Sequence, residues 1–388
     1  KTGGRHISLD YYAVTADGKH DPKAYLDMEI LLRPGETEGE YSIGDISSGY
    51  FTLLFNFRGN RKLSNQVRSE QQRQVYYNEQ ARAYDALDAI RSMPLMAEPF
   101  AAASRLAGEA GWHPVDALLA HNMANLDNKG VVRNAVGNYA NNPNSILSVL
   151  GQIADDRSGD EHTRMVSPYL FLARYTDSNG TVLLDEAESL RQFIDEHPKA
   201  KFELVTNSVL TSDNFSAQAV IDFDTAPRLL LPPDLRERWL ALSSANEGAS
   251  ELVNSPEWQA AVNHPRVAIY VTGGLDSSSF PGGDVTYGKL HAKYWQAENL
   301  GFVGTDNFDY RSRLYNSEMG YFFRGDTLSA DLIEDFEQLK TRSVRWGTPE
   351  WFELRRQVME MGGTKGRTTS SQRTIYKTLR ATGLKWLF

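Results

Sequence analysis

Cysteine is absent from the 388 residues of this chain. Its absence excludes disulfide bonds, thiolate metal sites and a cysteine nucleophile. Long apolar runs are missing as well: no stretch of about 18 consecutive apolar residues occurs, so we expect no membrane-spanning helix within the sequence. The candidate chemistry therefore rests on histidine, lysine, carboxylate, hydroxyl and amide side chains.

Positive charge is also scarce, since 41 Lys and Arg stand against 50 Asp and Glu and the net charge is −9. A general nucleic-acid binder usually carries a basic working face, so we expect no nucleic-acid partner. The exception is the segment 340–388, where 11 basic residues stand against 3 Glu. We expect this basic end, in which Ile375, Leu379 and Trp386 lie between the charges, to meet an anionic membrane surface. The alternative is a helix that packs on the protein's own body.

Strand-like and helix-like segments alternate with loops of ordinary length, which predicts an α/β fold. A helical texture runs from about Leu63 to Ala154, and within it the stretch 81–110 is rich in Ala, Leu, Met and Arg. A further helix is expected over 186–197. Strands are expected within 165–172 and over 201–208, 267–271, 289–295, 300–303 and 319–323.

Two parts of the sequence echo each other. Asp27-Met-Glu-Ile-Leu-Leu-Arg33 resembles Glu318-Met-Gly-Tyr-Phe-Phe-Arg324, and Thr2-Gly-Gly-Arg-His6 resembles Val303-Gly-Thr-Asp-Asn307. A duplicated fold accounts for both echoes, and it makes Asp27 the counterpart of Glu318.

One constellation carries phosphoryl-transfer chemistry. Strand alternation places His291 and Lys293 on the same face, and a hairpin returns Thr305 and Asn307 beside them. The ammonium, hydroxyl and amide suit the non-bridging oxygens of a phosphate, while the imidazole attacks phosphorus or protonates the leaving oxygen. We expect Glu318 to supply the carboxylate that fixes the tautomer of His291. The other His-x-Lys tripeptide, at His197, follows an expected helix end and is interpreted as structural.

The order His291, Lys293, Glu298 and Gly304-Thr305-Asp306-Asn307 resembles the second signature of the phospholipase D superfamily, with Glu298 in place of the usual aspartate. Ser167-Pro168-Tyr169 and Asn207-Ser208 resemble strand-end motifs of its bacterial cardiolipin synthase branch. The resemblance implies that Ser167, Tyr169, Asn207, Ser208, Thr305 and Glu298 help to bind substrate, and that His291, Lys293, Asn307 and Glu318 are catalytic.

The amino terminus resembles the end of the first signature of that superfamily, usually Gly-Gly-Arg-Asn, with His6 where asparagine is expected. On this comparison Gly4 and Asp27 belong to the substrate site. The histidine and lysine of that first signature would precede Lys1, so the first half is expected to be truncated here. The resemblance assigns His291 the acid/base role and leaves the nucleophile to the first half.

The resemblance implies a duplicated phospholipase D-type fold, with mixed sheets flanked by helices. We expect a remnant of the first half over 1–62, a helical insertion over 63–155, the second half over 156–338 and a basic helical tail over 339–388. The implied function is phosphatidyl transfer or phospholipase D activity through a phosphohistidine, without metal or organic cofactor, on the surface of a bacterial envelope membrane. The alternatives are a phosphodiesterase or nuclease of the same superfamily and a non-catalytic lipid-binding relic.

Overall fold

The computed structural model contains two compact units. The first comprises 1–6, 25–31 and 115–388, and the second comprises 7–24 and 32–114. The residues that the structure describes are 2–6, 9–15, 19–35, 41–57, 69–94, 96–98, 101, 105, 112–126, 136, 142–155, 159, 161–169, 171–242 and 246–384.

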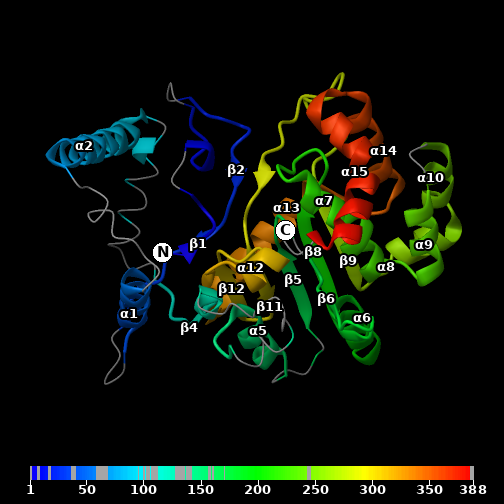
Figure 1. Ribbon diagram of the computed structural model, residues 1–388, viewed down its shortest axis with the longest axis horizontal. Coiled ribbons are helices and arrows are strands. Elements are labelled where there is room, and N and C mark those ends of the chain that lie inside the picture. The colour runs from blue at the N-terminus through cyan, green and yellow to red at the C-terminus, as the bar shows by residue number, and fades with distance from the viewer. Residues whose placement is uncertain are drawn as a thin grey trace. The chain divides into compact units, whose positions relative to one another are not determined.

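The first unit is built on a mixed sheet of eight strands (Figure 1). In spatial order the strands are β14 (Ser343–Arg345), β9 (Val267–Thr272), β8 (Lys201–Asn207), β5 (His162–Val166), β11 (Tyr294–Ala297), β12 (Leu300–Gly304), β13 (Met319–Arg324) and β4 (Asp116–His121). Strands β5, β8 and β9 run parallel, whereas the other neighbours pair antiparallel. The predicted α/β class and mixed sheet are confirmed.

Burial explains the composition of these strands. Every residue of β8 after Lys201 is buried, as expected for a parallel strand covered on both faces. Strand β12 pairs with β11 through a two-residue turn at 298–299, where Glu298 adopts a positive φ of 53°. The hairpin predicted from 289–295 and 300–303 is therefore present, and its first strand begins at Tyr294.

Helices flank the sheet of the first unit (Figure 1). Helix α13 contacts β5, β11 and β12, and α15 packs on α7 and α14. Four fully buried tryptophans, Trp239, Trp258, Trp346 and Trp351, belong to the main core. The helices are α5 (Ile146–Asp155), α6 (Glu186–Glu196), α7 (Phe215–Val220), α8 (Ala226–Leu230), α9 (Pro233–Ala241), α10 (Asn246–Val253), α11 (Pro256–Val262), α12 (Tyr310–Leu314), α13 (Asp326–Thr341), α14 (Pro349–Glu360) and α15 (Gly363–Thr382).

The amino-terminal part of the first unit adds two short pairings. Strand β1 (Thr2–Gly3) lies antiparallel to β3 (Glu29–Ile30), and β2 (Tyr25–Leu26) lies parallel to β10 (Lys289–Leu290). A third small pair, β6 (Arg174–Thr176) and β7 (Val182–Asp185), lies elsewhere in the unit. The pairing of β2 with β10 brings residue 27 next to residue 291, and this contact builds the site.

The segment predicted as a helical insertion contains both helices and a strand. Helix α2 (Glu70–Ser92) and helix α5 are present, but β4 joins the edge of the main sheet beside β13. The predicted boundary between 62 and 63 lies outside the described residues. The predicted domain limits and the duplication stay predictions.

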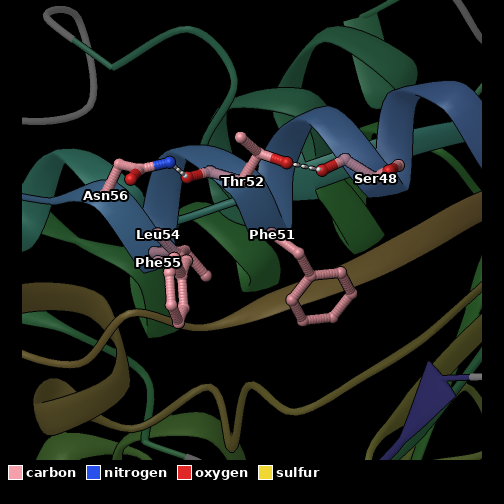
Figure 2. A pocket seen from close by; sticks show the side chains of 6 residues that line it. All are labelled: Ser48, Phe51, Thr52, Leu54, Phe55 and Asn56. Carbon is pink, nitrogen blue, oxygen red and sulfur yellow. Dashed lines mark hydrogen bonds between the residues drawn. The ribbon is translucent and has the colours of Figure 1, made fainter. Parts of the chain in front are cut away.

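Helix α1 (Ile43–Asn56) of the second unit begins at a capping box formed by Ser42 and Asp45. Figure 2 shows Ser48, Thr52 and Asn56 along one side of this helix, linked by hydrogen bonds to the backbone. Phe51 and Phe55 project from the other side and are 57% and 66% exposed. These residues and Leu54 line a hollow, and none of these six side chains is titratable.

The basic carboxyl-terminal segment forms α14 and α15. Tyr376 and Leu379 of α15 are buried in the core, and Ile375 packs against it. Ile375 and Leu379 therefore pack against the protein's own core. Leu384 is 45% exposed, and residues 385–388 lie outside the described part. Among the described helices, none is long and apolar enough to cross a bilayer.

Candidate active site

The backbone places His291 and Lys293 where β10 ends and β11 begins. The amides of His291 and Ala292 both donate to the carbonyl oxygen of Leu26, at 2.7 and 3.0 Å, so β2 fixes this turn. The side chain of Asn207 holds the other side, because its Oδ1 accepts from the Leu290 amide at 3.0 Å and its Nδ2 donates to the Leu290 carbonyl at 2.8 Å. Asn207 therefore positions the strand that leads to His291.

The carboxylate beside His291 is that of Asp27. Its Oδ2 lies 2.8 Å from Nδ1 of His291, and the Asp27 side chain is fully buried while that of His291 is 13% exposed. A carboxylate accepts but does not donate at neutral pH, so the contact with Asp27 is a hydrogen bond when the proton is on Nδ1. The reactive lone pair of the neutral imidazole is then on Nε2.

Lys293 lies against both groups. Its Nζ lies 2.6 Å from Nδ1 of His291, and it donates to the His291 carbonyl oxygen. Burial lowers the pKa of Lys293 to about 8, although the charges of Asp27 and Glu318 oppose that shift. Burial also lowers the pKa of His291. The hydrogen bond to Asp27 opposes this decrease, and the charge of Lys293 adds to it.

Gly4 makes room for this contact. A Cβ at position 4 would lie 2.9 Å from both Asp27 Oδ1 and Lys293 Nζ. Any larger residue would displace the pair, so Gly4 serves close packing of the site.

Glu318 has different contacts from those predicted. It accepts from the hydroxyl of Thr305, from Asn316 Nδ2 at 2.8 Å and from Ser312 Oγ at 3.3 Å. Thr305 in turn accepts from the Met319 amide at 3.1 Å. The carboxylate at Nδ1 of His291 is Asp27, and this corrects the expectation that Glu318 fixes the tautomer. Glu318 acts on the site through its charge on Lys293.

Asn307 follows β12 and joins the same region. Its carbonyl oxygen accepts from Ser167 Oγ at 2.5 Å, which ties the end of β5 to the signature loop. Its side-chain Oδ1 is buried and has no hydrogen-bond partner within the described structure. A buried acceptor without a donor is energetically costly.

Asp306 and Asp309 hold the loop that follows β12 through hydrogen bonds. Burial raises the pKa of Asp306 to about 7, and the nearby charge of Glu318 adds to the increase. Asn122 Nδ2 donates to Asp306 at 2.9 Å, and Asp309 caps α12 through the Ser312 amide at 2.7 Å. Both carboxylates position the loop.

The remaining predicted site residues are Tyr169, Ser208 and Glu298. Tyr169 donates its phenol to Asp213, close to the site, and Ser208 is fully buried, where its Oγ accepts from the Leu210 amide at 3.0 Å. Glu298 lies in the turn between β11 and β12, at the end of the hairpin opposite Lys293 and Gly304. The structure does not bring Glu298 to the site.

Two ring neighbours of His291, His6 and Tyr25, were not predicted as residues of the site. The rings of His6 and Tyr25 lie 5.4 and 5.5 Å from the His291 ring, both in edge-on contact. Tyr25 also donates to Asp213 at 2.8 Å. The available signal for His6 was its place in the first signature, where asparagine is expected.

Within the described residues, no group of three or more His, Asp or Glu side chains is arranged to hold a metal ion. The charged groups of the site are Lys293, Asp27 and Glu318, with His291 between the first two.

No protein-family model matches the sequence, and no curated protein matches it. The solved structures similar to this chain include phosphatidylserine synthase from Haemophilus influenzae Rd KW20, with a TM-score of 0.38 and 10% identity over 76% of this chain and 53% of that protein. They also include NucT from Helicobacter pylori and the phospholipase D family member Nuc from Salmonella typhimurium. Each of these two has a TM-score of 0.31 and 11% identity over 60% of this chain and 99% of its own. The chain therefore spans about half the length of the phosphatidylserine synthase.

Proposed function

We propose that this chain carries a catalytic half-site of a phospholipase D superfamily enzyme that transfers or hydrolyses the phosphatidyl group of phospholipids. The finer proposal is phosphatidyl transfer of the cardiolipin synthase kind. The observation that carries the proposal is the buried contact of Asp27, His291 and Lys293, which orients an imidazole beside an ammonium group. The signature from His291 to Asn307 supports it.

We infer that each of the two carboxylates, Asp27 and Glu318, serves one histidine. Asp27 belongs to the first part of the chain but serves His291 of the second part. Asp27 and Glu318 are counterparts in the sequence echo, so Glu318 would serve the histidine of a first half-site in the same exchanged manner. That histidine would be the nucleophile, and His291 would be the general acid and base.

The proposed reaction has two displacements. In the first, Nε2 of the nucleophilic histidine bonds to phosphorus, the bond from phosphorus to the headgroup oxygen breaks, and protonated His291 gives its Nε2 proton to that oxygen. In the second, His291 takes a proton from an acceptor alcohol or water, the new oxygen–phosphorus bond forms and the nitrogen–phosphorus bond breaks. Lys293 stabilises the charge on the non-bridging oxygens in both steps.

The pKa of His291 fits this cycle. Its lowered pKa favours the neutral form, which the second displacement needs. A bound phosphodiester places negative charge beside the ring, and a nearby opposite charge raises the pKa of an imidazole. Substrate binding therefore supports the protonated form that the first displacement needs.

A phospholipid substrate is supported by charge. The net charge of −9 disfavours a nucleic-acid substrate, while the basic segment 340–388 favours an anionic lipid surface. We place the protein at the periphery of a bacterial envelope membrane. Since Ile375 and Leu379 are packed in the core, the part of the segment proposed to meet the membrane is 384–388 with the exposed basic side chains before it.

The test uses the full-length natural protein with phosphatidylglycerol vesicles labelled in the phosphate. We expect release of phosphatidate or formation of a larger phosphatidyl lipid, and an acid-labile, base-stable label on protein after rapid quenching. His291→Ala should abolish turnover. His197→Ala, in the other His-x-Lys tripeptide, is the matched control and should keep it. Cleavage of single-stranded DNA with no action on phospholipid would refute the proposal in favour of a nuclease.

A further inference from the structure

A second polar cluster lies beside the catalytic histidine. Tyr25 and Tyr169 donate their phenols to the two carboxylate oxygens of Asp213, at 2.8 Å for Tyr25. Lys289 donates to the Tyr25 phenol oxygen at 3.4 Å, and its ammonium lies 4.8 Å from the centre of the Tyr25 ring. The Tyr25 ring also makes an edge-on contact with the His291 ring, and the two ring centres are 5.5 Å apart. Tyr25 thus joins the cluster to the catalytic site.

Lys365 completes the cluster from helix α15. Its Nζ donates to the carbonyl oxygen of Leu210, in the turn that precedes Asp213. Burial lowers the pKa of Lys365 to about 8; the charge of Lys289 lowers it further and that of Asp213 opposes the shift. The contact with Leu210 therefore places the ammonium of Lys365 beside the turn that leads to Asp213.

The cluster has positive charge in excess. Asp213 is its one carboxylate among the residues named here, and both of its oxygens are occupied by phenols. Within the part of the chain that the structure describes, neither lysine forms an ion pair. An anion bound by both lysines would relieve the repulsion through which the charge of Lys289 lowers the pKa of Lys365.

Tyr25 contacts both Lys289 and the catalytic histidine. The ammonium of Lys289 lies 4.8 Å from the centre of the Tyr25 ring, and the His291 ring lies 5.5 Å from it. One substrate can therefore place its reacting phosphate at His291 and Lys293 and a second anionic group at Lys289 and Lys365.

We propose that Lys289 and Lys365, supported by Tyr25, Tyr169 and Asp213, bind a second phosphate or carboxylate carried by the headgroup of the phospholipid donor or acceptor. The inference rests on the proposed function and names its substrate class: phospholipids whose headgroup bears an additional negative charge. Lys289 and Lys365 are specificity residues, because they contact the substrate away from the reacting phosphorus.

The test measures binding of soluble two-anion and one-anion probes by titration calorimetry. The full-length protein should bind glycerol 1,3-bisphosphate at least about tenfold more tightly than glycerol 3-phosphate, because linking two occupied sites raises affinity. Lys289→Gln and Lys365→Gln should each reduce this ratio to within about threefold. Lys289→Arg keeps the charge and should keep the ratio, and it verifies that the strand still folds when position 289 changes. Lys377→Gln, an exposed lysine on the same helix as Lys365, is the matched control.

The outcomes separate this inference from the proposed function. Equal affinity for the two probes in the wild-type protein, or an unchanged ratio in Lys289→Gln, overturns the second anion site. Inorganic phosphate that binds as tightly as the bisphosphate also overturns it, since a single free anion would then suffice. A high ratio that the lysine variants abolish, in a protein that turns over no phospholipid, supports the anion site and rejects the proposed function.

Discussion

Replacing Asp27 by asparagine is the sharpest test of the catalytic geometry. The fully buried Asp27 side chain is hydrogen-bonded to Nδ1 of His291 at 2.8 Å. Asparagine has nearly the same shape, and its Oδ1 can still accept from the Met28 amide, which donates to Asp27 Oδ1 at 2.9 Å. Its Nδ2 would donate to Nδ1 of the imidazole, so the ring proton would move to Nε2. The lone pair needed for proton transfer would then face away from the substrate.

The magnitude follows from the contact. A hydrogen bond to a charged group contributes about 1.5–3 kcal/mol. Since one pKa unit corresponds to about 1.4 kcal/mol, the pKa of His291 should fall by roughly one to two units further. Asp27 also raises the pKa of Lys293, so that pKa should fall below about 8. The wrong tautomer adds a loss of turnover that reaches about 10⁴-fold in a carboxylate–histidine pair of this kind.

The assay is the pH dependence of kcat/KM for phosphatidylglycerol or a chromogenic phosphodiester, on the full-length protein. We expect turnover to fall between about 10²- and 10⁴-fold, with both limbs of the profile displaced toward lower pH. Asp331→Asn, which changes an exposed aspartate on α13, should change neither quantity. Turnover within about threefold of wild type, or an acid limb that moves to higher pH, would show that Asp27 does not accept a hydrogen bond from Nδ1 of His291.

Other changes test the same site. Lys293→Met should lower kcat by about 10²–10³-fold in steady-state assays, as the loss of one oxyanion donor does, and an effect on KM alone would refute its role. His6→Asn should raise the pKa of His291 in an NMR titration, because the charge of His6 lowers it, and an unchanged pKa would contradict this. Gly4→Ala should cost about 1–3 kcal/mol of unfolding free energy through its clash with Asp27, measured by denaturant titration against the wild type. Chelation of divalent ions should leave turnover within about twofold, because Lys293 supplies the positive charge; activity restored only by added metal would reject this mechanism.

Local patterns predicted the hairpin that carries the signature. Alternation along His291 and Lys293, a short turn and the loop from Gly304 to Asn307 depend on neighbours within about 20 residues. The structure places them together, with the hairpin formed by β11 and β12. The strand β4 was missed because its six residues, Asp-Ala-Leu-Leu-Ala-His, suit a helix as well as a strand, and pairing with β13 decides between them.

The partner of His291 was not predictable from local patterns. Asp27 lies 264 residues away, and the echo with Glu318 indicated equivalence without showing which histidine each acid serves. Glu318 instead accepts hydrogen bonds from its neighbours in the folded loop, which are Thr305, Ser312 and Asn316. The buried Oδ1 of Asn307 depends on packing and has no signal in the sequence.

The pairing of β2 with β10 also bears on how the chain folds. The hairpin joining Tyr294 to Val303 closes a loop of a few residues, whereas the contact of Asp27 with His291 closes one of 264. Loop-closure entropy grows by about 0.6 kcal/mol with each doubling of length, so from an open chain the longer closure costs roughly 3 kcal/mol more. Long-range contacts have to overcome this entropy before they contribute stability. We therefore expect the hairpin of β11 and β12 to form before Asp27 reaches His291, so that a partly folded chain has this hairpin before it has an oriented imidazole.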